Sequence, residues 1–423
     1  MRYFKATLLI GFISILAIGL LDATGWLRTL DAWTVQSLGH LSVTGTLARP
    51  THAVAFLVGA LLAFAFAWTT ADLARPANKT LVAFFGILLL LTGAATLALY
   101  GVFVSPWPAV LMGLLSYVIG LCYGGSDSGS RKRMLQRLFG QRLSRKQFAQ
   151  LVDSSLPMNF PGSEQDATVI VCEVHNHVDL LEALGPEDYV AMTNLYLKTA
   201  SDYLVEAGGY LDECGGESLR VVFGAPLYRE DHAIVASKAA LEAVNRIDNL
   251  NKECDSRWHQ RLDFRVGVNS GPMVAAAYGG TRLGSFSVAG TTVEFARRLC
   301  AACATYGCRI LVGPETYAGA SEFIEARPIE LLRRPDGRRL ELYEMLAPVN
   351  ALSPERARSR DHFWKGVIFF RERKWDSAVE EFTKARIPGI PDSGLDAFVL
   401  RTERARRGEI TGQSADSSLA QIS

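Results

Sequence analysis

Three glutamates at the ends of two apolar runs are the residues of this sequence best suited to chemistry. Glu173 lies near the end of the run ATVIVCEV (167–174), and Glu213 and Glu217 flank the Gly-Gly turn of GGYLDECGGESLRVVFGAP (208–226). The second stretch predicts a β-hairpin, because paired glycines supply the positive φ that a tight turn demands. If the two strand ends are neighbours, the Glu173 and Glu217 carboxylates converge and suit divalent cations, which bind oxygen ligands and clamp phosphates. The alternative is a pair of solvated surface carboxylates.

Histidines and cysteines offer two other candidate metal sites. In the stretch EVHNH, a strand that continued would place Glu173, His175 and His177 on one face, as ligands of a transition metal. The alternative is a loop with exposed histidines. Three cysteines with the spacing C-x2-C-x4-C fall in and just after a predicted helix: Cys300, Cys303 and Cys308. We interpret them as small buried thiols rather than zinc or iron–sulfur ligands, because no fourth ligand lies nearby.

The elements around these residues follow a recognisable order. A strand at 167–174 is followed by a helix from Pro186, the hairpin, a helix in HAIVASKAALEAVNRIDNL and a strand in DFRVGVNSG. Further along lie the strand SFSVAG, the helix TTVEFARRLCAACATYG and the strand CRILVG. Strand, helix, hairpin, helix and strand is the order of a ferredoxin-like core. The predicted fold class is therefore α+β.

The first 125 residues predict a membrane region. Four runs without charges approach the ~20 residues that a membrane-spanning helix needs. These runs are 6–21, 53–69, 81–100 and 107–123. With four spans, the basic clusters at Arg2 and Lys5, at Arg75 and Lys79, and at 131–133 all fall on one side, which the positive-inside rule makes cytoplasmic. We expect an inner (plasma) membrane protein with four spans in 1–125, an outer loop at 22–52 and a cytoplasmic remainder.

The other segments are assigned by pattern. Residues 131–152 alternate basic and apolar side chains as an amphipathic helix does, and predict a stalk within 126–160. The stalk is expected to lie on anionic lipid, to pair with its copy in a second chain, or to be a solvated connector. A domain at 161–348 precedes a helical hairpin at 349–410 and a disordered tail at 411–423. The net charge of +1 gives no reason to expect a nucleic-acid partner.

Five stretches, by their order and spacing, resemble the class III nucleotide cyclases in their bacterial membrane-anchored form. They are ATVIVCEV, GGYLDECGGESLRVVFGAP, DHAIVASKAALEAV, FRVGVNSGPMVAAAYGG and SFSVAGTTVEFARRL. The resemblance implies a ferredoxin-like catalytic domain that forms a head-to-tail dimer, with its sites at the interface. It also implies two divalent cations, Mg²⁺ or Mn²⁺. The reaction it implies is attack of the ribose 3′-hydroxyl of a nucleoside triphosphate on the α-phosphate, which releases pyrophosphate.

The resemblance assigns roles to residues, and this sequence departs from the family pattern at most of them. The two metal-binding aspartates correspond to Glu173 and Glu217, with Val174 as a further metal position. The base-selecting lysine of adenylate cyclases corresponds to Glu213, and the second base-selecting position corresponds to Ser287. Glutamate also occupies the first of these positions in guanylate cyclases. The pair therefore favours GTP over ATP.

The remaining two positions lie on the predicted helix TTVEFARRLCAACATYG. The transition-state asparagine corresponds to Glu294, and the phosphate-binding arginine is kept as Arg298. Glu294 precedes Arg298 by one helical turn, a spacing that favours an ion pair between them. Such a pair would draw Arg298, the one phosphate ligand that this sequence retains, away from the phosphate. The whole set has four glutamates against one arginine, whereas the adenylate-cyclase set is neutral.

Two functions are consistent with these residues. The first is a membrane-anchored cyclase that converts GTP or ATP to the cyclic monophosphate, with Glu173 and Glu217 holding cations and Arg298 holding phosphate. The second is a catalytically silent cyclase-homology module that dimerises with itself or with a competent cyclase. A homodimer would carry the same altered site twice. A partner in a heterodimer could supply the missing groups at one interface.

The segment after 350 resembles regions found beside such domains. Trp375, Ala378 and Phe382 are spaced as in one tetratricopeptide-like unit. One such unit cannot form a solenoid, so we expect it to pack on the cyclase-like domain or on a partner.

Overall fold

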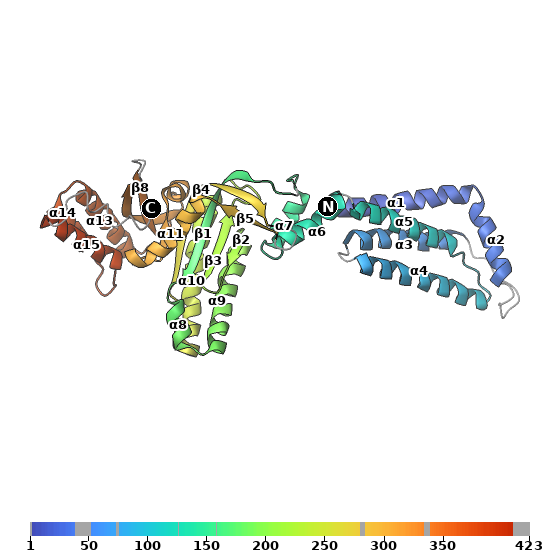
Figure 1. Ribbon diagram of the computed structural model, residues 1–423, viewed down its shortest axis with the longest axis horizontal. Helices are drawn as coiled ribbons and strands as arrows, with labels where there is room; N and C mark the ends of the chain where they lie inside the picture. Colours follow the sequence, from blue (N-terminus) through green and yellow to red (C-terminus); the bar gives the residue numbers. More distant parts are fainter. Residues whose placement is uncertain are drawn as a thin grey trace. The chain divides into compact units, whose positions relative to one another are not determined.

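The computed structural model describes residues 2–38, 52–72, 76–125, 127–157, 159–279, 284–333 and 339–408. The chain divides into two compact units, Met1–Gln136 and Arg137–Ser423. Figure 1 labels most of the helices and strands of both units. The predicted tail at 411–423 lies outside the described residues.

The described part of the first unit consists mainly of helices. Its helices are α1 (Arg2–Ala23), α2 (Trp26–Leu38), α3 (His52–Asp72), α4 (Pro76–Leu99) and α5 (Trp107–Gly125). In the residues described, four segments are long and apolar enough to cross a membrane: Phe4–Ala23, Ala53–Thr70, Asn78–Leu99 and Trp107–Gly124. They coincide with the four predicted apolar runs. Helix α2 falls in the segment predicted to be the outer loop, and residues 39–51 of that segment are not described.

Small residues allow α3 and α5 to approach closely. The position that a Cβ would take on Gly59 lies 3.0 Å from the Ala109 Cα, and the corresponding position on Gly120 overlaps the Thr70 side chain. The Ser116 hydroxyl donates a hydrogen bond of 2.6 Å to the Ala63 carbonyl. Close backbone approach at small residues and hydrogen bonds between helices are the usual means of packing helices in lipid.

The second unit is built on an eight-stranded mixed sheet. Its first four strands are β1 (Ser163–Val174), β2 (Tyr210–Cys214), β3 (Ser218–Phe223) and β4 (Phe264–Tyr278), which pair antiparallel in the order β2-β3-β1-β4. This is the predicted ferredoxin-like core, and the α+β fold class is confirmed. The sheet continues through β6 (Ile310–Val312), β8 (Arg339–Pro348) and β7 (Ile324–Arg333), while β5 (Ser285–Ala289) pairs with β4.

Helices cover both faces of this sheet. On one face α8 (His177–Ala183), α9 (Pro186–Glu206) and α10 (His232–Trp258) enclose the main core, and Figure 1 shows α9 and α10 alongside the strands. On the other face α11 (Thr291–Tyr306) packs against β4 and β1. Successive side chains of β1 point to opposite faces of the sheet. Cys172 and Val174 therefore enter the main core, while Glu173 is directed to the face that α11 covers. The short helix α12 (Pro314–Ala320) follows β6.

The predicted stalk is two helices rather than one. Helix α6 (Asp127–Phe139) ends before Gly140, whose φ of +52° is left-handed, and α7 (Arg145–Asp153) begins after the N-cap Ser144. The Ser144 side chain accepts a hydrogen bond from the Gln147 backbone amide, and the Gln147 side-chain carbonyl accepts one from the Ser144 backbone amide. The glycine and this capping box end one helix and start the next.

The apolar side chains at this break are buried on the domain. Phe139 is fully buried and contacts the rings of Phe160, Tyr210 and Phe286 at centroid distances of 5.1 to 5.6 Å. The Arg142 guanidinium donates a hydrogen bond of 3.0 Å to the backbone carbonyl of Asp212. The segment from Phe139 on is thus part of the domain's packing, and the solvated connector is excluded for it.

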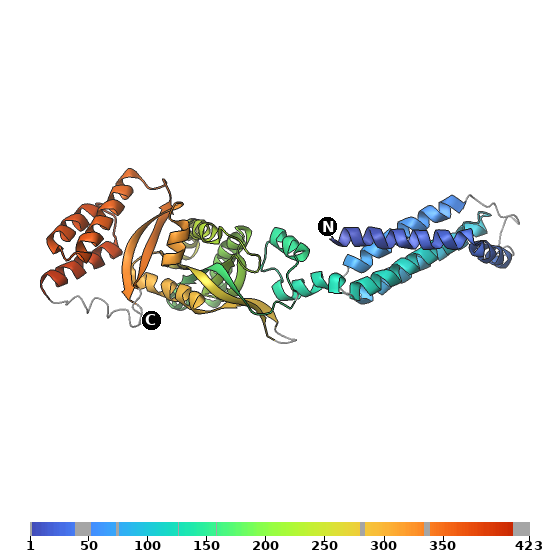
Figure 2. The ribbon, with the colours of Figure 1, turned by 90° about the horizontal axis from the view of Figure 1, so that it is seen from above.

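Three helices, not a two-helix hairpin, follow the sheet: α13 (Pro354–Arg371), α14 (Trp375–Ala385) and α15 (Ser393–Arg406). Ala378 and Phe382 are fully buried, as the tetratricopeptide-like spacing predicts, and Gly366 lets the Phe382 ring lie against α13. These helices share a core with α11, β7 and β8, and Figure 2 shows them beside the β7–β8 hairpin. The segment therefore packs on the cyclase-like domain, one of the two predicted outcomes.

Candidate nucleotide and cation site

The ends of β1 and β3 bring Glu173 and Glu217 to adjacent positions in the sheet. Glu173 lies opposite Ser218, and the Val174 amide donates a hydrogen bond of 2.9 Å to the Glu217 carbonyl. The prediction that these strand ends are neighbours is confirmed. The Glu173 side chain is 31% exposed, and Glu217 is exposed at the turn. Both carboxylates reach solvent.

The donors gathered around Glu173 are not those of a pair of carboxylates. Among the residues that the structure describes, one group of three histidine, cysteine or acidic ligands has its donor atoms within 4.8 Å of one another, and it consists of Glu173, His175 and Cys300. The Glu173 Oε2 and His175 Nε2 atoms are 3.9 Å apart. Glu217 is not a member of the group.

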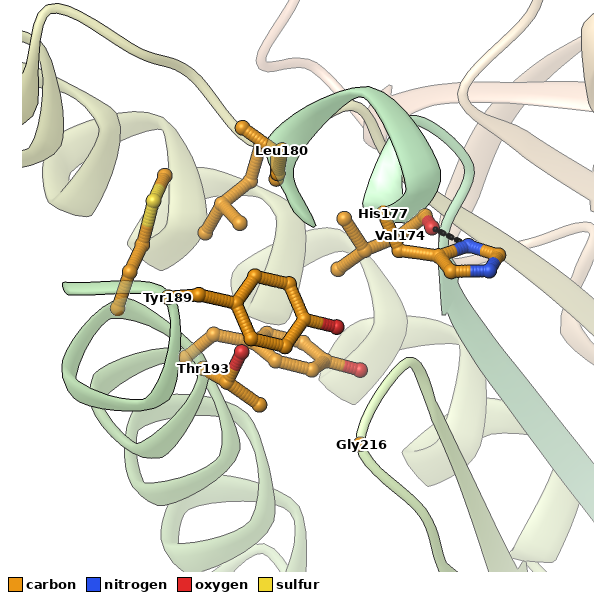
Figure 3. A pocket seen from close by; sticks show the side chains of 9 residues that line it. Val174, His177, Leu180, Tyr189, Thr193 and Gly216 are labelled. Carbon is orange, nitrogen blue, oxygen red and sulfur yellow. Dashed lines mark hydrogen bonds between the residues drawn. The ribbon is translucent and has the colours of Figure 1, made fainter. Parts of the chain in front are cut away.

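The second histidine of EVHNH has another role. His177 begins α8, and its Nδ1 atom lies 3.1 Å from the Val174 carbonyl oxygen, as Figure 3 shows. The prediction that Glu173, His175 and His177 share one face of a strand is therefore wrong for His177, because the strand ends at Val174 and the chain turns. The Val174 carbonyl, a predicted metal position, already has a hydrogen-bonding partner.

A cavity beside this turn is lined on one side by Val174, His177 and Gly216 and on the other by Tyr189 and Thr193 of α9 (Figure 3). Its volume is about 10 Å³, which is room for one water molecule. A nucleotide does not fit there. Nucleotide binding at these residues therefore requires a larger surface than this cavity.

The predicted base-selecting glutamate is held by an arginine of its own chain. Glu213 on β2 lies opposite Arg220 on β3, and their charged groups are 2.9 Å apart. The same guanidinium donates a hydrogen bond of 2.7 Å to the fully buried Asp212 carboxylate. Arg220 thus neutralises a charge that the count of four glutamates against one arginine did not balance.

Ser287 lies on β5 opposite Ala276, half-buried, next to the aromatic cluster. The Tyr210 hydroxyl donates a hydrogen bond of 2.5 Å to the Phe286 carbonyl and so ties β2 to β5. Burial raises the pKa of Tyr210 to about 12, so the phenol keeps its proton at neutral pH. The strands that carry Glu213 and Ser287 are held together by this contact.

Glu294 and Arg298 are both exposed on α11. Glu294 forms an ion pair with Arg297 at 3.3 Å, and the pair of Glu294 with Arg298 stays a prediction. Glu294 also lies in the first turn of α11, where the positive end of the helix dipole favours a carboxylate. Arg297, like Arg220, is a counter-charge that the comparison of motif positions missed.

The comparisons with known proteins assign this domain. A sequence profile of the adenylate and guanylate cyclase catalytic domain matches residues 161–331. The domain belongs to the class III adenylate and guanylate cyclase family. Domains of this family use divalent cations, act as dimers and bind nucleoside triphosphates.

Individual relatives of this cyclase domain are distant. Adenylate cyclase 1 of Rhizobium meliloti is 23% identical over 194 residues, 46% of this chain and 29% of that protein. An uncharacterized protein of Mycobacterium tuberculosis is 26% identical over 198 residues, 46% of this chain and 33% of that protein. The match thus spans about a third of the length of these relatives.

Solved structures of cyclases are similar to a comparable share of the chain. The adenylyl cyclase CyaB from P. aeruginosa has a TM-score of 0.41 at 22% identity, covering 46% of this chain and 100% of that chain. The guanylate cyclase domain from Catenaria anguillulae, in complex with GTP, has a TM-score of 0.39 at 22% identity, covering 44% and 99%.

The two Mg²⁺ or Mn²⁺ ions expected from the resemblance do not match the donors that this cyclase domain gathers. Mg²⁺ takes oxygen ligands in octahedral geometry, whereas imidazole and thiolate suit transition metals. Here Glu173 lies with an imidazole and a thiol, and Glu217 lies outside that group.

Proposed function

We propose that this chain is a membrane-anchored signalling protein whose cyclase domain, as a homodimer, has lost most of its cyclase activity. The domain acts instead by pairing with a second cyclase domain. One observation carries the proposal: the altered positions are engaged within the chain itself. Glu213 pairs with Arg220, Glu294 pairs with Arg297, and the Val174 carbonyl accepts from His177.

Three of the alterations work against turnover. Replacing an aspartate by glutamate at positions 173 and 217 moves the carboxylate outward by about one C–C bond, and a misplacement of ~1 Å can cost about 100-fold in rate. A carboxylate at position 294 would face the triphosphate, and two like charges ~4 Å apart repel by about 4 kcal/mol near a protein surface. Arg297 offsets part of that charge, but it does not supply the amide that orients the transition state.

The domain retains groups that suit binding. Arg298 is exposed on α11, where it can meet a phosphate presented by a partner domain. Glu213 and Ser287 lie on strands joined through Tyr210, and a carboxylate with a hydroxyl favours guanine over adenine. We therefore propose a nucleoside triphosphate, GTP before ATP, as the ligand at the dimer interface.

A weak cyclase is the second candidate, favoured by the carboxylates that persist at both metal positions on adjacent strand ends. In that case Glu213 reads the base and Arg298 holds phosphate, while the ribose 3′-hydroxyl attacks the α-phosphate and pyrophosphate leaves. The four apolar helices and the basic clusters support an inner-membrane location with the cyclase domain in the cytoplasm.

The test is cyclic-nucleotide production by the full chain in lipid nanodiscs, with Mn²⁺ and each of the four common triphosphates. We expect no product above that of a Glu173→Ala variant, from a protein shown to be dimeric and folded. A cyclic product that disappears in the variant would establish the second candidate instead.

A further inference from the structure

Three side chains with different donor atoms converge where β1 ends. The Glu173 carboxylate, the His175 imidazole and the Cys300 thiol each offer an atom within 4.8 Å of the other two. Glu173 lies at the end of β1, His175 follows that strand directly, and Cys300 lies on the buried side of α11. Segments more than 120 residues apart in sequence thus build one small group. Neither the imidazole nor the thiol is among the family positions named above.

A glycine makes this convergence possible. On β4, the position that a Cβ would take at Gly267 lies 2.2 Å from the Ala296 carbonyl oxygen and 2.4 Å from the Cys300 amide nitrogen. Any larger residue would push α11 away from the sheet. The absent side chain lets the helix lie on the strand and brings Cys300, which is fully buried, beside β1.

The imidazole is directed into the group without a partner. The His175 Nε2 atom is buried and has no hydrogen-bond partner in the described part of the chain. Its main chain is fixed, because the His175 amide donates a hydrogen bond of 2.9 Å to the Asp263 carbonyl. Buried polar atoms are rarely left unpaired, so this nitrogen is available as a ligand atom.

The neighbouring cation does not compensate for Glu173. Arg265 lies opposite Glu173 on β4, but its guanidinium binds the Asp263 carboxylate and the carbonyls of Cys303 and Cys308. Among the residues that the structure describes, the Glu173 carboxylate lies beside one chargeable group, the His175 imidazole, at 3.9 Å. The Cys300 thiol donates a hydrogen bond of 3.4 Å to the Arg265 carbonyl, and releasing that bond would free the sulfur to share a ligand with the carboxylate and the imidazole.

We propose that Glu173, His175 and Cys300 bind one transition-metal ion of the zinc class. Oxygen, nitrogen and sulfur donors are the ligands that zinc takes in proteins, and three of them leave a fourth position for water. The partial exposure of Glu173 gives the ion a path from solvent. On binding, the Cys300 thiol exchanges its proton, which leaves to solvent, for a sulfur–metal bond.

The site would give the domain a response to transition metals that needs neither nucleotide nor turnover. Occupied, it joins β1 to α11 and withdraws Glu173 from any magnesium at the interface. The site therefore goes beyond the proposed function, and its test does not depend on activity.

Cobalt is the probe, because Co²⁺ bound by a thiolate has a charge-transfer band and tetrahedral d–d bands that Zn²⁺ removes on exchange. The full chain in nanodiscs, carrying Cys214→Ser to remove an exposed thiol, is titrated with Co²⁺ under reducing, metal-free conditions. We expect one equivalent per chain with the thiolate band. The band should disappear in Cys300→Ser and in His175→Ala.

The matched control is Cys303→Ser. Cys303 is also fully buried on α11, and its Sγ contacts the Val266 and Leu299 carbonyls rather than the donor group. It should keep the cobalt spectrum. His175 lies in a turn, so His175→Ala tests the site even if Cys300→Ser does not fold. No thiolate band, or equal bands in His175→Ala and the parent, would overturn the proposal.

Discussion

The arginine that ties the β7–β8 hairpin to the C-terminal helices gives the sharpest test of the packing. Arg327 is buried, with its guanidinium over the Phe363 ring at 4.5 Å. It donates to the Glu344 carboxylate at 2.7 Å and to both oxygens of Asp392 at 2.6 and 2.8 Å. Asp392 in turn caps α15 by accepting a hydrogen bond from the Leu395 amide. We consider the variant Arg327→Met, which keeps the length of the side chain.

The variant leaves two carboxylates without their counter-ion. Removing one partner of a buried ion pair typically costs about 3–5 kcal/mol. Water reaches Asp392, whose side chain is 26% exposed, so we expect the lower end, about 3 kcal/mol. At roughly 2–4 °C per kcal/mol for a domain of about this size, Tm should fall by about 6–12 °C.

The pH dependence has a definite sign. Burial raises the pKa of Glu344, and Arg327 counteracts that rise. Burial opposes ionisation of Asp392, but Arg327 outweighs it and lowers the pKa of that carboxyl, so Asp392 contributes stability that is lost as the pH falls. Without Arg327 both pKa values rise above their unfolded values. Stability of the variant then falls as the pH rises, and its deficit at pH 7.5 should shrink at pH 5.

The measurement is thermal unfolding of the detergent-solubilised chain by near-UV circular dichroism at pH 5 and pH 7.5. Arg246→Met is the control: its ion pair with Glu242 is about half exposed, and such pairs contribute about 0.3–0.5 kcal/mol. Adding Glu344→Gln to Arg327→Met should recover part of the loss. A variant that melts with the wild type at pH 7.5, or whose deficit grows on acidification, would refute the reasoning.

Three further substitutions test other parts of the domain. Phe139→Ala removes the centre of the aromatic cluster and should cost about 3–5 kcal/mol in chemical unfolding; an unchanged midpoint would show that the segment after α6 is not docked. Gly267→Ala forces α11 off the sheet and should cost at least ~1–3 kcal/mol, which a retained Tm would contradict. Arg220→Met leaves the buried Asp212 carboxylate without its counter-ion and should lower the free energy of unfolding by about 3 kcal/mol. Arg220→Lys should restore only part of that stability, and full restoration by lysine would argue against the two contacts of the Arg220 guanidinium.

Local patterns in the sequence were enough to predict the core. The ferredoxin-like order came from apolar runs and paired glycines, and the four apolar helices came from runs without charge. The adjacency of Glu173 and Glu217 followed from the order of strands, because the hairpin must pair beside β1.

What the sequence did not predict depends on contacts between distant segments. Cys300 joins Glu173 only because Gly267 seats α11 on β4, which no local spacing reveals. Arg220 and Arg297 are not positions of the family motif, so a count of motif charges passed over both.

The sequence does contain a signal for the break between the two stalk helices, although the prediction was a single helix. A glycine at 140 followed by S-x-x-Q at 144–147 marks the end of one helix and the capped start of another. The basic and apolar alternation across 131–152 concealed it, because both helices carry the same pattern.

The central claim is that altered residues, not a failure to fold, deprive this cyclase domain of turnover. The most direct measurement compares cyclic-nucleotide formation by the wild-type chain and by a variant carrying Glu173→Asp, Glu217→Asp and Glu294→Asn, both in nanodiscs with Mn²⁺ and GTP. The account predicts product from the variant at least ~100-fold above the wild type, since each restored carboxylate position alone is worth about that much. Wild-type activity equal to that of the variant would contradict it.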